Sequence, residues 1–174
     1  MIVQKVLNNS LVLSMDDDNR EVIVMGKGIG FNSRPGDAIA PEKIEKLFVT
    51  QALGARSGYL EALSAIPDEV IEMAAMIISR ANMQLASKVR EQIFFTLADH
   101  LTFAIERSRK GIAIQNRLLP EVRRFYPQQF RVASEAVTII RQQYGIELPE
   151  EEAGNIAFHL VNGQSEGDDV AQTM

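Results

Sequence analysis

The spacing of hydrophobic and polar residues changes about one third of the way along the chain. Before residue 50, short aliphatic and β-branched runs alternate with polar turn residues, whereas after residue 58 apolar residues recur every three or four positions. The first spacing is typical of β-strands and the second of amphipathic helices. The pattern therefore predicts a β-rich segment followed by an all-helical segment.

The β-rich segment is predicted to contain four short strands. Polar turns separate them, among them Asn8–Ser10 and Asp16–Asn19. The expected strands are Ile2–Leu7, Leu11–Met15, Glu21–Met25 and Ile44–Thr50. Short strands that follow one another so closely favour an antiparallel meander, and a sheet of this size favours packing against a second copy.

The helical segment is predicted to form a bundle of about five helices. Its longest run of helical spacing is Lys88–Arg107, with no Pro or Gly before Gly111, and His100 lies at the edge of the apolar stripe. Proline followed by acidic residues, as at Pro67 and Pro149, is typical of a helix start. Two of the expected helices begin at Pro67 and Pro149. Three others span Lys88–Arg107, Leu118–Phe125 and Gln128–Tyr144, and a shorter one is expected at Tyr59–Ile66.

These elements predict an α+β fold of two domains, a small antiparallel β-sheet followed by an all-α bundle. The strand-like pattern ends around Gly54 and Gly58, and the residues after Gly163 are mostly polar. We therefore expect a β domain at 1–55, a linker with a short helix at 56–64, a helical domain at 65–165 and a linker-like tail at 166–174. A chain that ends in a linker is expected to be part of a longer protein.

Composition narrows the class of protein. The chain has 174 residues, 46% of them hydrophobic, with two histidines and no cysteine. We therefore expect neither disulfides nor a structural zinc site, and no cofactor. No signal peptide or membrane span is apparent, so we expect a cytoplasmic protein. The net charge of −5 argues against binding of nucleic acid by bulk electrostatics, so such binding would have to recognise shape with few cations.

The glycine-rich stretch Gly26–Phe31 allows two interpretations. Its glycine spacing does not fit a dinucleotide fingerprint, and no helix is predicted after it. As an RNA-contact loop, it would bring the backbone close to a ribose-phosphate, with Lys27 as a cation and Phe31 as a stacking face. As a tight turn, it would pack Phe31 in the core.

A second candidate group is Lys5 with the turn Asn8–Ser10. Side-chain amides at the end of a strand can hydrogen-bond to base edges, but they are equally common as turn formers. The residues alone leave both interpretations open.

The only two histidines, His100 and His159, are each predicted on a helix among apolar residues. Each could be a core histidine, an acid–base group or a phosphoryl acceptor. A phosphoryl acceptor needs a partly exposed ring nitrogen and an orienting hydrogen bond, which the surroundings of Asp99 and His100 could supply. No serine motif or thiol suits a nucleophilic triad, and no further metal ligands accompany the pair. We therefore predict that the chain is not an enzyme.

Six stretches carry motifs in a characteristic order. They are M-I-V-Q-K-V-L-N-N-S, V-I-V-M-G-K-G-I-G-F, I-E-K-L-F, L-A-D-H-L-T-F-A-I-E-R, L-L-P-E-V-R-R-F-Y-P and E-E-E-A-G-N-I-A-F-H-L. The first three resemble the co-antiterminator RNA-binding domain of the BglG/SacY/LicT family of transcriptional antiterminators. The last three resemble the first PTS-regulation domain of the same family, so the resemblance covers nearly the whole chain.

The resemblance implies an RNA-binding function. Members of this family bind, as homodimers, an imperfect hairpin in the mRNA leader of sugar-utilisation operons and so block a terminator hairpin; DNA is not their target. The matching RNA-contact positions are Lys5, Asn8, Ser10, Gly26, Lys27, Gly28 and Phe31. The family often has Asn at the position of Ser10 and Arg at that of Lys27, and lysine lacks the planar bidentate fork of arginine.

The resemblance also implies regulation by phosphorylation of His100 and His159. In relatives, the sugar permease (enzyme II) of the phosphotransferase system phosphorylates this domain and inactivates the protein, while the carrier HPr phosphorylates a second regulatory domain of the full-length protein. A purely protein-binding regulatory module and an acid–base enzyme that uses both histidines are the alternatives.

Overall fold

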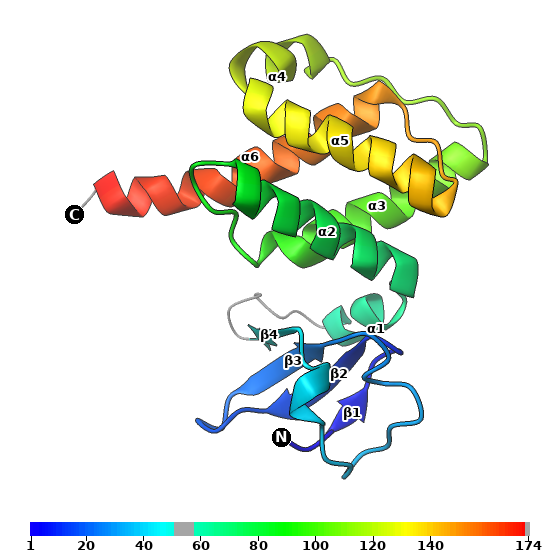
Figure 1. Cartoon of the computed structure of the whole chain (residues 1–174), viewed down its shortest axis with the longest axis vertical. Helices are drawn as coiled ribbons and strands as arrows, with labels where there is room; N and C mark the ends of the chain where they lie inside the picture. The colour runs from blue at the N-terminus through cyan, green and yellow to red at the C-terminus, as the bar shows by residue number, and fades with distance from the viewer. Residues whose placement is uncertain (51–57, 173–174) are drawn as a thin grey trace. The chain divides into compact units, whose positions relative to one another are not determined.

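The computed structural model describes residues 1–50 and 58–172. The chain divides into two compact units, Met1–Ile71 and Glu72–Met174. The first contains a four-stranded sheet, and the second contains most of the helices (Figure 1). The predicted α+β class, with a sheet followed by helices, is confirmed.

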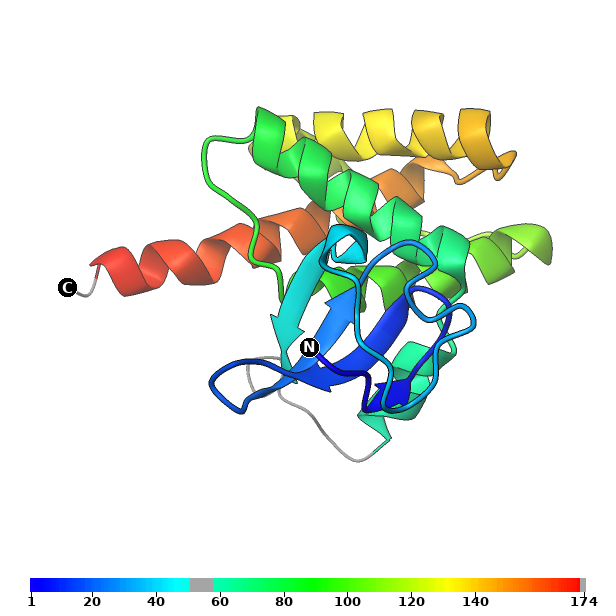
Figure 2. The ribbon, with the colours of Figure 1, turned by 60° about the horizontal axis from the view of Figure 1, so that its bottom comes forward.

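The sheet is an antiparallel meander in the order β1-β2-β3-β4 (Figure 2). Its strands are β1 (Lys5–Val6), β2 (Leu11–Met15), β3 (Glu21–Met25) and β4 (Lys46–Val49), with a 3-10 turn at Pro41–Lys43 before β4. The strand predicted at Ile2–Leu7 is shorter than expected because Val3 bonds elsewhere. Its N–H donates to the Asp37 carbonyl (2.9 Å) and its carbonyl accepts from Gly36 N–H (2.8 Å).

Both faces of this small sheet are buried. Residues directly opposite each other share a face, and Leu13 lies opposite Ile23, which lies opposite Phe48. The other face belongs to a core cluster made of Val3, Val12, Val22, Val24, Ile29 and Ile39. Helix α1 (Tyr59–Ser64) lies beside the sheet in Figures 1 and 2, within the same unit.

The helices that follow are α2 (Asp68–Gln84), α3 (Ile93–Arg109), α4 (Leu119–Phe125), α5 (Pro127–Tyr144) and α6 (Glu150–Gln172). Their apolar stripes form the core of the second unit. The largest fully buried side chains there are those of Met73, Ile77, Ile78, Phe94, Leu97, Leu101, Ile140, Ile156, Leu160 and Glu152. Within the described residues, no helix is long and apolar enough to cross a membrane.

Helix α3 begins at Ile93, five residues later than the predicted Lys88–Arg107. The backbone before it is used by tertiary partners, because Val89 N–H donates to Asn82 Oδ1 (2.8 Å) and Arg90 N–H donates to the Gly163 carbonyl (3.1 Å). Packing is tight here, since a Cβ on Gly163 would lie 2.7 Å from Val89 Cγ1. These tertiary bonds keep the segment out of the helix despite its helical spacing.

The C-terminal stretch also differs from the prediction. Helix α6 continues to Gln172, so residues 166–172 are helical where a linker-like tail was expected. No proline follows Pro149, and a helix nucleated by its packed first half extends at little cost. Residues 51–57, which hold the end of the predicted β domain and the start of the predicted linker, lie outside the described residues.

Candidate nucleic-acid interface and histidine pair

The glycine-rich stretch Gly26–Phe31 forms a loop after β3 that packs closely on neighbouring backbone. A Cβ on Gly26 would collide with the Lys43 carbonyl oxygen, and one on Gly30 would collide with the Asn8 carbonyl oxygen. Gly30 N–H also donates to the Asn9 carbonyl (2.8 Å). Gly28 has a φ of 69°, in the left-handed region. The loop is therefore fixed against the turn Asn8–Ser10.

This loop presents Phe31 and Lys27 to solvent. The Phe31 side chain is 63% exposed, and Lys27 is exposed as well. Ile29, at 4% exposure, is the residue of the loop that enters the core. The interpretation in which Phe31 packs in the core is therefore wrong. An exposed aromatic ring in the same loop as an exposed cation is suited to stacking with an unpaired base.

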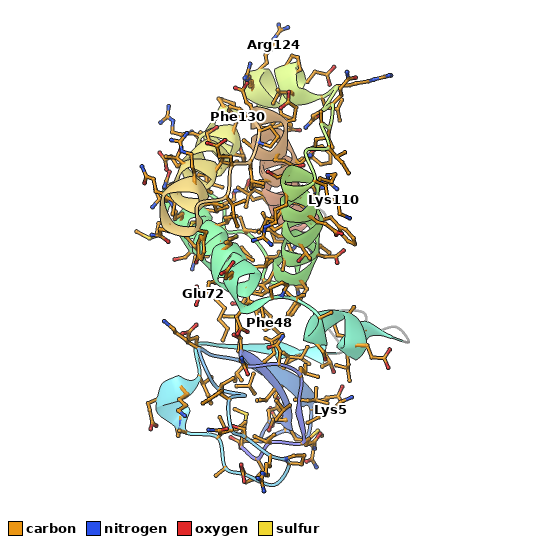
Figure 3. The ribbon with its side chains drawn as sticks, turned by 90° about the vertical axis from the view of Figure 1, so that its right-hand side faces the viewer. Lys5, Phe48, Glu72, Lys110, Arg124 and Phe130 are labelled. Carbon is orange, nitrogen blue, oxygen red and sulfur yellow. The ribbon has the colours of Figure 1, made fainter. Side chains whose placement is uncertain are left out.

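Asn8 acts as the turn-forming residue of the turn Asn8–Ser10. Asn8 Oδ1 accepts from the backbone N–H groups of Ser10 and Leu11, both at 2.9 Å. This is the local side-chain-to-backbone bonding that favours asparagine in turns. Lys5, on β1, is exposed, and Figure 3 shows its side chain at the surface of the sheet unit.

The remaining side-chain donors of this turn bond to the end of α1, to the residues after it and to the start of α2. Asn8 Nδ2 donates to the carbonyl oxygens of Leu63 (3.2 Å) and Ile66 (3.3 Å). Ser10 Oγ donates to Asp68 Oδ1 (2.9 Å), and Asn9 Nδ2 donates to Asp68 Oδ2 (3.3 Å).

The seven predicted RNA-contact residues therefore fall into three groups. Lys5, Lys27 and Phe31 face solvent. Gly26 and Gly28 shape the loop. Asn8 and Ser10 hold hydrogen bonds within the unit.

The two histidines, which are far apart in the sequence, lie together in the second unit. His100 on α3 and His159 on α6 have ring centroids 5.1 Å apart with the planes tilted by 51°. Helices α3 and α6 pack against each other, so the pair sits at a helix–helix contact. Both histidines are partly buried.

A buried carboxylate orients one ring of this pair, that of His100. Glu152 on α6 is 2% exposed, and its Oε2 lies 2.8 Å from His100 Nε2. Its Oε1 accepts from Arg107 Nη2 (3.0 Å), and Asn155 Nδ2 donates to Oε2 (3.4 Å). Asp99, the acidic residue favoured by the sequence, is exposed and is not the partner of His100. A His–Glu pair also suits acid–base chemistry, so the absence of enzyme activity stays a prediction.

Sequence reasoning missed Glu152 and Arg107, although a spacing signal was present. Arg107 follows His100 by seven residues, and Glu152 precedes His159 by seven. Seven residues are about two helical turns, so each pair lies on one helix face. On each of the two helices, a charged residue lies on the same face as the histidine. This repeated pattern indicates that the four residues share one buried site.

Two pKa values in this site are shifted. Burial would raise the pKa of Glu152, but hydrogen bonds from His100 and Arg107 outweigh it and hold the pKa of this carboxyl below its ordinary value of 4.5. Burial, reinforced by the charge of His100, lowers the pKa of His159 below 6.5. At neutral pH, Glu152 is therefore ionised and His159 is neutral.

We expect the His159 shift to make stability depend on pH below 6.5. In that range His159 is protonated in the unfolded chain but still neutral in the folded chain. The free energy of unfolding therefore decreases as the pH is lowered from 6.5, until the pH reaches the pKa of His159 in the folded chain. The His159→Gln variant should show a shallower fall there. Urea denaturation at a series of pH values measures this. The Glu152 contribution is lost separately, below 4.5, and identical slopes for the two chains above that pH would contradict the expectation.

Comparison with known proteins assigns both units. Residues 1–54 match the CAT RNA binding domain, and residues 75–163, more than half of the chain, match the PRD domain. The chain belongs to the BglG/SacY/LicT family of CAT–PRD proteins. All seven predicted RNA-contact residues lie within the CAT match, and both histidines, Arg107 and Glu152 lie within the PRD match.

Relatives of this CAT–PRD chain include named antiterminators. The beta-glucoside operon antiterminator of Dickeya chrysanthemi is 42% identical over 164 residues, which cover 94% of this chain and 58% of that protein. Transcription antiterminator LicT of Bacillus subtilis (strain 168) is 37% identical over 164 residues, covering 94% and 59%. The crystal structure of GlcT CAT-PRDI has a TM-score of 0.80 and 29% identity, covering 94% of this chain and 97% of that one. The chain thus spans less than two thirds of the two antiterminators.

Proposed function

We propose that this protein is a sugar-responsive transcriptional antiterminator of the cytoplasm. Its CAT domain binds a hairpin in an mRNA leader and prevents a terminator from forming. Its PRD domain receives phosphoryl groups on His100 and His159 from a phosphotransferase-system sugar permease. HPr is the second donor where a further regulatory domain follows. The relatives named as antiterminators support this proposal, as does the order of the two domains.

The observation that carries the RNA-binding part is the exposure of both Phe31 and Lys27 in one loop whose backbone is fixed. A fixed loop offers a stacking face without a large cost of ordering it on binding. The first 55 residues hold six Lys and Arg against seven Asp and Glu, so bulk charge supplies little attraction. Asp16–Asp18 are therefore placed away from the RNA in this proposal.

A homodimer would compensate for this weak charge. Two linked copies of the Gly26–Phe31 loop on one hairpin raise the overall affinity without any new contact, because the second binding event is intramolecular. In the PRD domain, Phe103 on α3 and Phe158 on α6 are 52% and 42% exposed, close in sequence to the two histidines. We assign these rings to the surface that a second copy covers.

Phosphorylation would act on that surface. A phosphoryl group adds about two negative charges at neutral pH. On His100 or His159 these charges would lie near exposed apolar rings, where desolvation and repulsion between two copies are costly. The modification therefore weakens the active dimer, and RNA affinity falls with it.

RNA binding is tested by a mobility shift of the full chain against leader hairpins at fixed salt. We expect Phe31→Ala to weaken binding about 10- to 100-fold, because loss of stacking costs about 1–3 kcal/mol per base. Stability should change little, since the ring is exposed. Phe125→Ala is the matched control, because that ring is 65% exposed in the PRD domain. Equal affinities for the Phe31→Ala variant and the parent chain would refute the proposed interface.

Regulation is tested with a phosphorylated sugar permease as donor. The parent chain should incorporate label, and the double variant His100→Ala, His159→Ala should not. Sedimentation and the mobility shift then report whether labelling weakens the dimer and RNA binding. His100→Asp should weaken RNA binding more than His100→Ala, because only the first introduces a charge. Equal affinities for these two variants would contradict the electrostatic mechanism.

A further inference from the structure

The hydrogen bond between His100 and Glu152 distinguishes the two nitrogens of the His100 ring. Nε2 lies 2.8 Å from Glu152 Oε2. The carboxylate itself is held by Arg107 on its other oxygen (3.0 Å) and by Asn155 (3.4 Å). Asn155 is fixed in turn, because its Oδ1 accepts from Asn116 Nδ2 (2.9 Å). The acceptor for Nε2 is thus rigidly placed.

The charge of Glu152 decides which nitrogen carries the proton. The hydrogen bonds from His100 and Arg107 outweigh burial and keep the carboxyl pKa below 4.5, so the group is ionised at neutral pH. An ionised carboxylate can only accept hydrogen bonds. His100 Nε2 must therefore be the donor, and in the neutral ring the lone pair belongs to Nδ1.

Nδ1 of His100 is also the accessible nitrogen. Nδ1 has no hydrogen-bond partner among the described residues. It is also not among their buried polar atoms that lack a partner, and it is therefore in contact with solvent. The His100 side chain as a whole is 21% exposed. His159 differs, because no described group bonds to either of its ring nitrogens and its tautomer is not fixed in this way.

We propose that Nδ1 of His100 is the phosphoryl acceptor and that Glu152 is the positioning residue that directs transfer to this nitrogen. The proposal rests on the proposed function for the phosphorylation of His100 and for the identity of the donor protein, and the structure supplies the choice of nitrogen. The role of Glu152 resembles that of a carboxylate that orients a catalytic imidazole by bonding to the nitrogen opposite the reacting one.

The transfer balances without any other reactant. The Nδ1 lone pair forms a bond to phosphorus while the N–P or S–P bond of the donor breaks and its electron pair leaves with the donor nitrogen or sulfur. Nδ1 carries no proton, so none has to be removed before attack. The ring keeps its proton on Nε2 and becomes positively charged, and ionised Glu152 stabilises that charge.

The test uses the full chain carrying His159→Gln, so that His100 is the only histidine, with potassium phosphoramidate as the donor. In that reaction the P–N bond of the reagent breaks and ammonia leaves. Nitrogen-15 NMR of labelled histidine reports the tautomer before reaction and the phosphorylated nitrogen afterwards. We expect the Nε2–H tautomer at the start and a phosphoryl group on Nδ1 at the end.

Glu152→Gln should give a mixture of tautomers and slow Nδ1 labelling by about tenfold, the value of one charge-assisted hydrogen bond. Glu151→Gln is the matched control, because it removes the same charge one residue away and should leave both readouts unchanged. A role in stability alone would lower the unfolding midpoint of Glu152→Gln without altering tautomer or isomer. The tautomer of the Glu152-containing chain tests the proposal even if Glu152→Gln does not fold.

Phosphorylation on Nε2, or an Nδ1–H tautomer in the chain that retains Glu152, would overturn the proposal. The outcome is separable from that of the proposed function. Labelling on Nδ1 by phosphoramidate but none by the permease would refute only the proposed donor. Labelling on Nε2 by the permease would leave the proposed function intact and refute the role of Glu152.

Discussion

Replacing Phe94 by alanine is expected to lower the free energy of unfolding of the PRD domain by about 3–5 kcal/mol. Phe94 is fully buried on α3 and packs edge-to-face with Phe95 at a centroid distance of 5.1 Å. Truncation removes buried apolar surface and leaves a cavity that the surrounding helices fill only in part. Urea denaturation followed by far-UV circular dichroism measures the loss.

Phe103→Ala is the matched control for this prediction. The same residue type lies nine positions later on the same helix but is 52% exposed. At a protein concentration where the chain is monomeric, its removal should cost less than about 1 kcal/mol, because little surface that is buried within one copy is lost. Equal losses for the two variants would show that the core of the domain does not lie where α3 packs.

Gly30→Ala is expected to destabilise the CAT domain by about 3 kcal/mol and to abolish RNA binding. The new methyl group would collide with the Asn8 carbonyl oxygen, a backbone atom that cannot rotate away. Overpacking of this kind moves backbone and typically costs about 1–3 kcal/mol, occasionally more. The loop would then separate from the turn Asn8–Ser10 and lose the fixed position of Phe31. Denaturation and the mobility shift measure the two effects.

Gly28→Ala in the same loop separates collision from backbone strain. A Cβ there meets nothing within 4 Å, and the φ of 69° is a left-handed value. The expected cost is about 1 kcal/mol, from backbone strain alone. A Gly28→Ala variant as unstable as Gly30→Ala would contradict the close approach of the loop to Asn8.

Local signals predicted most of the helices. Pro127 stands at the first position of α5 and Gly145, with a φ of 67°, ends it, so proline and glycine mark this helix at both ends. The start of α3 could not be predicted in this way. The helical spacing continues back to Lys88, but the bonds to Asn82 and Gly163 come from residues distant in the sequence or on another helix. Tertiary contacts of this kind override a local pattern.

The candidate site shows the same division. The residue types of the Gly26–Phe31 loop left two interpretations open, an RNA-contact loop and a tight turn with Phe31 in the core. Only the structure shows that Ile29 rather than Phe31 enters the core. Glu152 reads locally as one of three acids in the first turn of a helix, which is a common preference. Its burial depends on His100 and Arg107, which precede it by more than 40 residues.

The hydrogen bonds of the turn Asn8–Ser10 compete with any ligand that would bind the same side chains. A ligand that uses the Asn8 amide or the Ser10 hydroxyl must displace the carbonyl oxygens of Leu63 and Ile66 or the Asp68 carboxylate. Its measured dissociation constant is then larger than the intrinsic one by the inverse of the fraction of molecules in which the turn is open. Thermodynamic linkage makes the effect mutual. Any change that destabilises the start of α2 therefore raises the affinity of Asn8–Ser10 for that ligand.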